Sequence, residues 1–88
     1  MTVRASKRFF RDLSKLNSLE VLDDAEFIFD LAQTVVEPEH IPGFKWLMGH
    51  DGYGRIAIGA YRIGVEVQAD TIIFRCVMHR SVVYKFFP

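Results

Sequence analysis

A histidine, an arginine and a tyrosine lie close together near the end of the sequence. His79 and Arg80 directly follow the apolar run Thr71–Met78, and Tyr84 comes a few residues later. The run is apolar on both faces and rich in Ile, Val and Phe, which is typical of an interior strand. A guanidinium matches phosphate oxygens with a two-pronged fork and stays charged, and a histidine can carry a proton near neutral pH. The sequence therefore places groups that could bind phosphate and carry a proton at the end of one strand.

Two further arginines lie on preceding segments that alternate between apolar and polar residues. Strict alternation over Tyr61–Gln68 predicts a strand with one buried face, and Arg62 falls on the other face. The run Arg55–Gly59 alternates in the same way, with Arg55 opposite its isoleucines. One face of the sheet can therefore carry both arginines.

A purely structural account of these arginines is also available. On an exposed sheet face the arginines would form ion pairs with the nearby carboxylates Glu66 and Asp70. For any single arginine this is the commoner arrangement. The aromatic side chains Trp46, Tyr61 and Phe74 are interpreted as core residues and not as stacking platforms for a ligand.

The N-terminal part of the sequence predicts two amphipathic helices. Ser6 is a suitable N-cap for a first helix over Lys7–Leu16. Asn17 is predicted to cap a second helix, with Glu20 in the capping-box position, and Pro38 cannot continue that helix. The predicted buried face of the second helix comprises Val21, Ala25, Ile28, Ala32 and Val35.

Short strands complete the expected order of elements. Thr2–Ala5 is predicted as a short edge strand and Phe44–Met48 as a further strand, whereas Val82–Pro88 fits either a turn of helix or a last strand. The predicted fold class is α+β, with two N-terminal helices packed on one face of a curved, mainly antiparallel sheet of four to five strands. Residues 1–88 are predicted to form one domain, whose other sheet face is open and carries the cations.

The formal net charge is zero, but the charges are segregated along the chain. Residues 1–19 carry five basic residues against one acidic residue, and residues 20–39 carry seven acidic residues and no Lys or Arg. Residues 40–88 carry six basic residues against three acidic ones. The sheet side can therefore be positive in a protein that is neutral overall, and the acidic residues of the second helix are interpreted as a solvated face.

Several classes of protein are excluded or disfavoured. The single Cys76 rules out an internal disulfide and a cysteine-based zinc site. No apolar run approaches the length of a membrane span, and the basic first ten residues do not resemble a secretory signal. We expect a cytoplasmic protein that uses no cofactor and no metal.

The order and spacing of these segments resemble the RelE/ParE superfamily of toxins over nearly the whole chain. The similar segments are Ser6–Leu13, Tyr61–Ile63, Val77–Arg80 and Val83–Pro88. The resemblance implies the toxin of a type II toxin–antitoxin pair. In the RelE branch such a toxin cleaves messenger RNA in the ribosomal A site, and in the ParE branch it poisons DNA gyrase.

The resemblance also implies roles for individual residues. Arg62 would stabilise phosphate charge, Arg80 would assist the leaving group, and Tyr84 would stack on or orient the substrate nucleotide. Arg55 falls where the RelE branch has the first of two lysines, whereas Ala57 falls where it has the second, which would help to activate the attacking 2′-hydroxyl. The predicted catalytic residues are Arg55, Arg62, Arg80, Tyr84 and His79, where His79 would substitute as the proton carrier, and the predicted substrate contacts are Lys45, Arg75 and Lys85.

Three functions of different classes follow from the resemblance. The first is a ribosome-dependent messenger RNA endoribonuclease that inhibits translation by attack of the RNA 2′-hydroxyl. The second is a DNA gyrase inhibitor without nuclease activity, which the alanine at position 57 favours. The third is a non-toxic member of the superfamily that only binds its antitoxin. The expected partners are a cognate antitoxin together with the ribosome and messenger RNA, or DNA gyrase in the second case.

Overall fold

A computed structural model describes all residues of the chain, 1–88. The elements in chain order are β1 (Thr2–Ala5), α1 (Lys7–Ser14), α2 (Leu19–Ala32), the short 3-10 helix η1 (Pro38–His40), β2 (Phe44–Trp46), β3 (Tyr53–Ile58), β4 (Tyr61–Gln68), β5 (Thr71–His79) and α3 (Val83–Phe86). The α+β class and the predicted order of helices and strands are confirmed. The C-terminal segment, for which a helical turn and a strand were both open, forms the helix α3.

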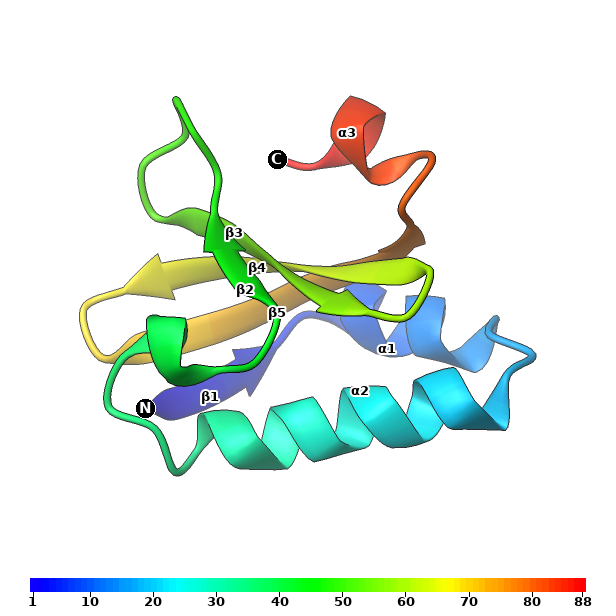
Figure 1. Cartoon of the computed structure of the whole chain (residues 1–88), viewed down its shortest axis with the longest axis horizontal. Helices are drawn as coiled ribbons and strands as arrows, with labels where there is room; N and C mark the ends of the chain where they lie inside the picture. Colours follow the sequence, from blue (N-terminus) through cyan, green and yellow to red (C-terminus); the bar gives the residue numbers. More distant parts are fainter.

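The five strands form one sheet in the order β1-β5-β4-β3-β2 (Figure 1). β2, β3, β4 and β5 pair with their neighbours in antiparallel fashion, and β1 pairs with β5 in parallel. The predicted mainly antiparallel sheet, with Thr2–Ala5 at one edge, is therefore confirmed. The predicted strand Phe44–Met48 is shorter than expected and ends at Trp46, because the chain turns there into the loop that precedes β3.

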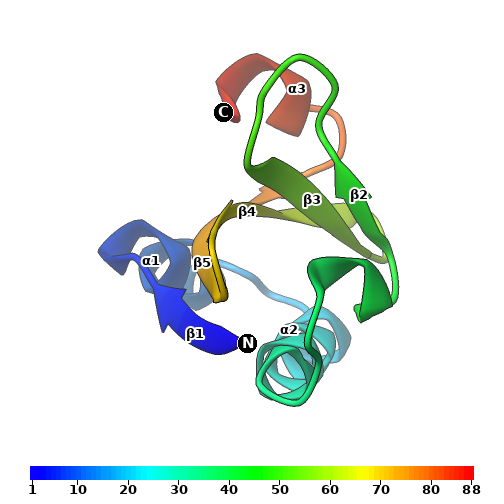
Figure 2. The ribbon, with the colours of Figure 1, turned by 90° about the vertical axis from the view of Figure 1, so that its left-hand side faces the viewer.

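The helices α1 and α2 cover one face of the sheet, whereas α3 lies on the other side (Figure 2). The main core lies between the two long helices and the sheet, and it gathers the inward residues of both layers: Phe9, Ala25, Ile28, Ala32, Ile41, Ile56, Ile58, Ile63, Val65, Ile72, Phe74 and Val77. Burial of this apolar area is the main force that holds the helices on the sheet.

The two helix starts agree with the sequence to within one residue. Ser6 caps α1 as predicted, and its Oγ accepts the backbone N–H of Phe9 at 3.2 Å. The prediction that Asn17 caps α2 is wrong. Ser18 is the cap, because its Oγ accepts the backbone N–H of Val21 at 3.2 Å and leaves Asn17 outside the helix.

The second face of the sheet is not fully open, which corrects the expectation of an uncovered cationic face. A smaller apolar cluster of Cys76, Met78, Val83 and Phe87 packs the C-terminal segment onto this face. Gly64 on β4 makes room for the segment, since a Cβ atom there would lie 2.8 Å from Cγ of Phe87. The part of the face near β2, β3 and the start of β4 remains accessible.

No helix is long and apolar enough to cross a membrane.

Candidate functional site

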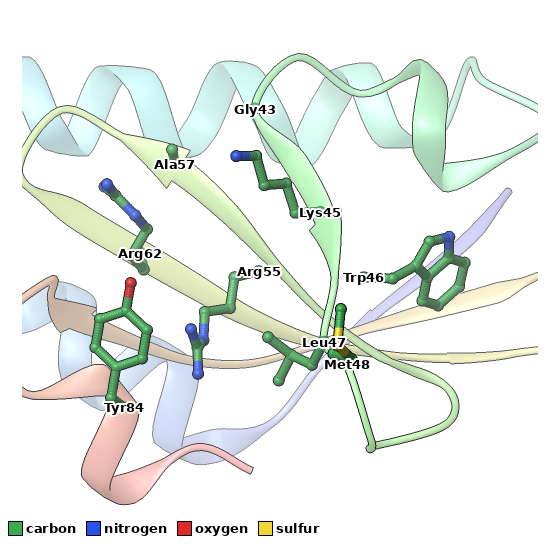
Figure 3. Close-up of a pocket in the computed structure, with 9 residues that line it drawn as sticks. All are labelled: Gly43, Lys45, Trp46, Leu47, Met48, Arg55, Ala57, Arg62 and Tyr84. Carbon is green, nitrogen blue, oxygen red and sulfur yellow. The ribbon is translucent and has the colours of Figure 1, made fainter.

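A cavity of about 400 Å³ opens on the part of the sheet that α3 leaves uncovered (Figure 3). Its lining comes from β2, β3 and β4 together with the loop after β2 and the helix α3. The lining residues are Gly43, Lys45, Trp46, Leu47, Met48, Arg55, Ala57, Arg62 and Tyr84.

Arg62 enters the cavity from the beginning of β4. Its Nη1 donates to the carbonyl oxygens of Tyr61 at 2.8 Å and Gly59 at 3.0 Å, which fixes the guanidinium against the turn between β3 and β4. Both bonds use one nitrogen. Nη2 and Nε of Arg62 therefore remain free to hold two oxygens of one phosphate group, the arrangement in which arginine binds phosphate best.

Arg55 enters the cavity from β3 and contacts the C-terminal segment. Its guanidinium carbon lies 4.4 Å from the ring centroid of Tyr84, and Nη2 donates to the carbonyl oxygen of Phe87 at 3.3 Å. Its Nε is buried and has no hydrogen-bond partner. A buried donor without a partner is uncommon in native structures.

Tyr84 reaches the cavity although its own backbone belongs to α3. The neighbouring side chains of Val83 and Phe87 are buried and anchor the segment, while the Tyr84 ring is 75% exposed. Figure 3 shows the phenol hydroxyl pointing toward Arg62 and the ring beside Arg55. An exposed aromatic face next to phosphate-binding arginines can stack on a nucleobase.

Lys45 brings a third cation from β2. It is the Cα partner of Arg55 in the sheet, and its ammonium end points toward Ala57, with Arg62 beyond it (Figure 3). The close approach of β2 to β3 depends on Gly43, whose carbonyl accepts the N–H of Ala57 at 3.0 Å. Gly43 has φ +80, and a Cβ atom there would meet the Ala57 oxygen at 2.9 Å, so this position requires glycine.

None of the three cations of the cavity has a carboxylate partner. The two salt bridges of the molecule join Arg8 to Asp12 at 3.6 Å and Arg75 to Glu66 at 3.0 Å. The structural account from the sequence, in which Glu66 would neutralise Arg55 and Arg62, therefore does not apply to these two arginines. The positive charge of the cavity is left for a ligand.

Glu39 lies near the cavity, but its carboxylate is hydrogen-bonded to Trp46. The Trp46 indole Nε1 donates to Glu39 Oε2 at 3.1 Å, and this hydrogen bond lowers the pKa of the Glu39 carboxyl.

The prediction that Trp46 is a core residue is wrong, since its side chain is 45% exposed, whereas Phe74 is fully buried as expected. β2 is an edge strand, so Trp46 has no neighbouring strand to cover it.

His79 and Arg80 are not among the residues that line the cavity. His79 is the last residue of β5, and its Nδ1 accepts the N–H of Ser81 at 3.1 Å and lies 2.8 Å from the Ser81 hydroxyl. Arg80 is exposed in the following turn, where its backbone N–H donates to the carbonyl of Ala60 at 2.8 Å. Both residues lie at the end of the sheet where β4 begins.

The remaining predicted contacts also lie outside this cavity. Arg75 is bound to Glu66 and lines a separate cavity of about 330 Å³ together with Arg8. Lys85 is exposed on α3. The structure therefore brings together Lys45, Arg55, Arg62 and Tyr84 from the predicted set.

Two features of the site were not found from the sequence. The loop residues Leu47 and Met48 line the cavity, and the Phe87 carbonyl anchors Arg55. The sequence also gives no sign that Gly43 is needed to bring β2 against β3. No group of three or more His, Cys, Asp or Glu side chains is arranged to hold a metal ion. What the cavity offers is two arginines, a lysine and a phenol.

The chain was compared with known proteins. No family model matches it. Toxin RelE3 of Methanocaldococcus jannaschii is 54% identical over 44 residues, and this stretch spans only 50% of the present chain and 50% of that protein's length.

Solved structures match over a greater length. The toxin in the RelB–RelE antitoxin–toxin complex from Methanococcus jannaschii superposes with a TM-score of 0.81 at 34% identity, covering 97% of this chain and 99% of that chain. The RelBE2 toxin–antitoxin complex from Mycobacterium tuberculosis gives a TM-score of 0.66 at 26% identity, covering 90% and 96% of the two chains. With a third of its residues identical to those of the first structure over almost the full length of both chains, this chain belongs to the RelE superfamily of toxins.

Proposed function

We propose that this chain is the toxin of a type II toxin–antitoxin pair and acts as a ribosome-dependent messenger RNA endoribonuclease that inhibits translation. The observation that carries the proposal is the cavity in which Lys45, Arg55 and Arg62 converge without a carboxylate partner. The exposed ring of Tyr84 adds an aromatic face to this cavity. Cations beside an aromatic face fit a phosphate and the nucleobase next to it.

The chemistry needs little from the protein beyond position and charge. RNA carries its own nucleophile, the 2′-hydroxyl, which attacks the adjacent phosphorus and expels the 5′-oxygen of the next nucleotide. Negative charge builds on the phosphate oxygens as the bond to phosphorus forms. Preorganised guanidinium groups at Arg62 and Arg55 stabilise this charge in the transition state, and removing a single such donor costs about 10²- to 10³-fold in rate.

The test is induced expression of the chain alone, followed by primer extension on an abundant translated message. We expect growth arrest and new 5′ ends at fixed codon positions, which disappear when translation is blocked. Arg62→Gln is expected to abolish the new ends, whereas Arg11→Gln, an exposed arginine of α1, serves as the matched control. Circular dichroism of both purified variants checks that they fold.

Other outcomes would assign the other functions. Growth arrest with intact messages and an accumulation of cleaved DNA would move the assignment to inhibition of DNA gyrase. Absence of arrest from a folded, expressed protein would leave a member of the superfamily that only binds its antitoxin.

A cognate antitoxin is the proposed partner. The structures from Methanococcus jannaschii and Mycobacterium tuberculosis are both toxin–antitoxin complexes. An acidic segment of the partner would complement the three unpaired cations of the cavity, and such complementarity favours fast and specific association. Co-expression with the product of the neighbouring reading frame is expected to relieve the growth arrest, and purification of a stable complex checks the contact directly. Arrest that persists with the partner present at equal level would contradict this pairing.

A further inference from the structure

We infer that Lys45 is the proton acceptor for the attacking 2′-hydroxyl, and that it acts from β2 across the surface of Ala57. The inference deepens the proposed function and rests on it. It assigns to one side chain of the cavity a role that the arginines cannot fill.

The first step is an elimination among the polar groups that line the cavity. Arg55 and Arg62 cannot give up their charge in a protein, so neither can take a proton. The Trp46 indole is a donor only and is bonded to Glu39 at 3.1 Å. Lys45 and Tyr84 are the remaining polar side chains that line the cavity, and both can exchange a proton.

The second step separates these two candidates by their surroundings. The Tyr84 ring lies at 4.4 Å from the guanidinium of Arg55, measured to the ring centroid, and its hydroxyl points toward Arg62, so this phenol already lies against two cations. Lys45 has no ion pair and no hydrogen-bond partner, and its side chain extends toward Ala57 (Figure 3). An amine that is free of partners can approach a ligand hydroxyl directly.

The third step is the geometry of neighbouring strands. Lys45 is paired with Arg55, and Ala57, two residues further along β3, lies diagonally across from it on the same face. Diagonal neighbours on adjacent strands are about 7–8 Å apart, within reach of a long side chain. Because Ala57 is small, the lysine stem can lie over it, and a ligand held by Arg62 on the far side would face the amine.

His79 lies outside the cavity. It is not among the lining residues, and its Nδ1 accepts a hydrogen bond from the backbone N–H of Ser81. Lys45 therefore takes the place of His79 as the proposed proton carrier.

The proposed step balances without a further reagent. The neutral amine of Lys45 takes the proton of the 2′-hydroxyl while a bond forms between the 2′-oxygen and phosphorus. The bond from phosphorus to the 5′-oxygen breaks, and this oxygen takes a proton from water. The lysine ammonium then returns its proton to the resulting hydroxide, and nothing is oxidised or reduced. The products are a 2′,3′-cyclic phosphate and a 5′-hydroxyl.

The test measures the rate of single-turnover cleavage of messenger RNA on purified translating ribosomes at one fixed pH. The variants are Lys45→Arg, which keeps the charge but cannot accept a proton, and Lys45→Met. We expect both variants to lose about 10²- to 10⁴-fold in rate, and Lys45→Arg to be as slow as Lys45→Met although it keeps the charge. Lys7→Arg, an exposed lysine of α1, is the matched control.

A double variant gives an independent check. Lys45→Met with Ala57→Lys returns an amine to the same space from β3, and we expect it to recover part of the lost rate. A Lys45→Arg variant that keeps most of the wild-type rate would show that Lys45 only supplies positive charge, and this would overturn the inference. So would a double variant without recovery, or a loss of rate in Tyr84→Phe as large as the loss in Lys45→Met. A wild-type protein that cuts no message would instead overturn the proposed function itself.

Discussion

The guanidinium carbon of Arg55 lies 4.4 Å from the centroid of the Tyr84 ring, and Nη2 of the same guanidinium donates to the Phe87 carbonyl at 3.3 Å. One side chain of β3 thus contacts α3 at Tyr84 and the residue directly after the helix, Phe87. The two contacts tie the helix that carries the aromatic group of the site to the strand that carries the cation.

Removing this connection should loosen α3. We expect Arg55→Met to lower the free energy of unfolding by about 1–2 kcal/mol, because it removes a cation–π contact and a hydrogen bond from a charged donor. Urea denaturation measures the change. In a double-mutant cycle with Tyr84→Ala the two losses should be coupled by about 0.5–1 kcal/mol.

The control for this cycle is Arg11→Met, at an exposed arginine that makes no ion pair. It should change stability by less than about 0.5 kcal/mol. Strictly additive effects of the Arg55 and Tyr84 substitutions would contradict the coupling.

Asp12 joins α1 to the middle of β5. Its Oδ2 accepts the backbone N–H of Val77 at 2.9 Å and lies 3.6 Å from Nε of Arg8. Asp12→Ala would leave the Val77 N–H without a partner, and we expect a loss of about 1–3 kcal/mol in the free energy of unfolding. Asp12→Asn keeps an acceptor oxygen and should cost less. Asp23→Ala on the solvated face of α2 is the control, and equal losses in the three variants would rule out this role.

Gly64 gives the C-terminal segment its place on the sheet. A Cβ atom at this position would lie 2.7 Å from Sγ of Cys76 and 2.8 Å from Cγ of Phe87. We expect Gly64→Ala to cost about 1–3 kcal/mol through overpacking and to expose residues 82–88 to proteolysis. Limited proteolysis with mass spectrometry identifies the cleaved segment. Ala60→Ser in the exposed turn before β4 should not change the cleavage pattern, and protection of the segment in Gly64→Ala would disprove the packing argument.

Cys76 makes stability depend on pH in the alkaline range. Burial raises the pKa of its thiol above the ordinary value, so the folded state holds this proton more tightly than the unfolded state does. Its contribution to stability is therefore complete below the ordinary pKa of about 8.5 and is lost as the pH rises above it. We expect the midpoint of thermal unfolding to fall above about pH 8.5, and to fall less in Cys76→Ala.

Alkylation gives an independent measure of the same burial. The side chain of Cys76 is 2% exposed. Iodoacetamide should react slowly with the native protein and rapidly in urea, since only the accessible thiolate is nucleophilic. Rapid reaction of the native protein would show that the C-terminal segment does not cover this thiol.

The helices and strands could be predicted from the sequence because the patterns that mark them involve only residues close together in the chain. Alternation over Tyr61–Gln68 and the cap at Ser6 depend on residues within one turn or one strand. The α2 cap was misplaced by one residue because Asn17 and Ser18 are both good caps, and only the geometry of the chain leaving α1 selects between them.

The site was predicted less completely because it depends on contacts between distant segments. Strand parity was enough to place Arg55 and Arg62 on one face. The covering of that face by Val83 and Phe87 could not be predicted. The last seven residues show neither the apolar periodicity of a helix nor that of a strand. The position of Lys45 beside Ala57 depends on the pairing register of β2 with β3, which the sequence alone does not fix.

The parallel pairing of β1 with β5 sets the order in which the molecule can be completed as it is synthesised. Thr2–Ala5 is made before the other strands but finds its partner only when β5 has left the ribosome, so the main core cannot close before then. Tyr84 follows later still, and it reaches Arg55 only after Val83 and Phe87 can pack on the finished sheet. A nascent chain therefore holds its arginines before it holds its aromatic group, and the cavity is complete only after both have joined the sheet.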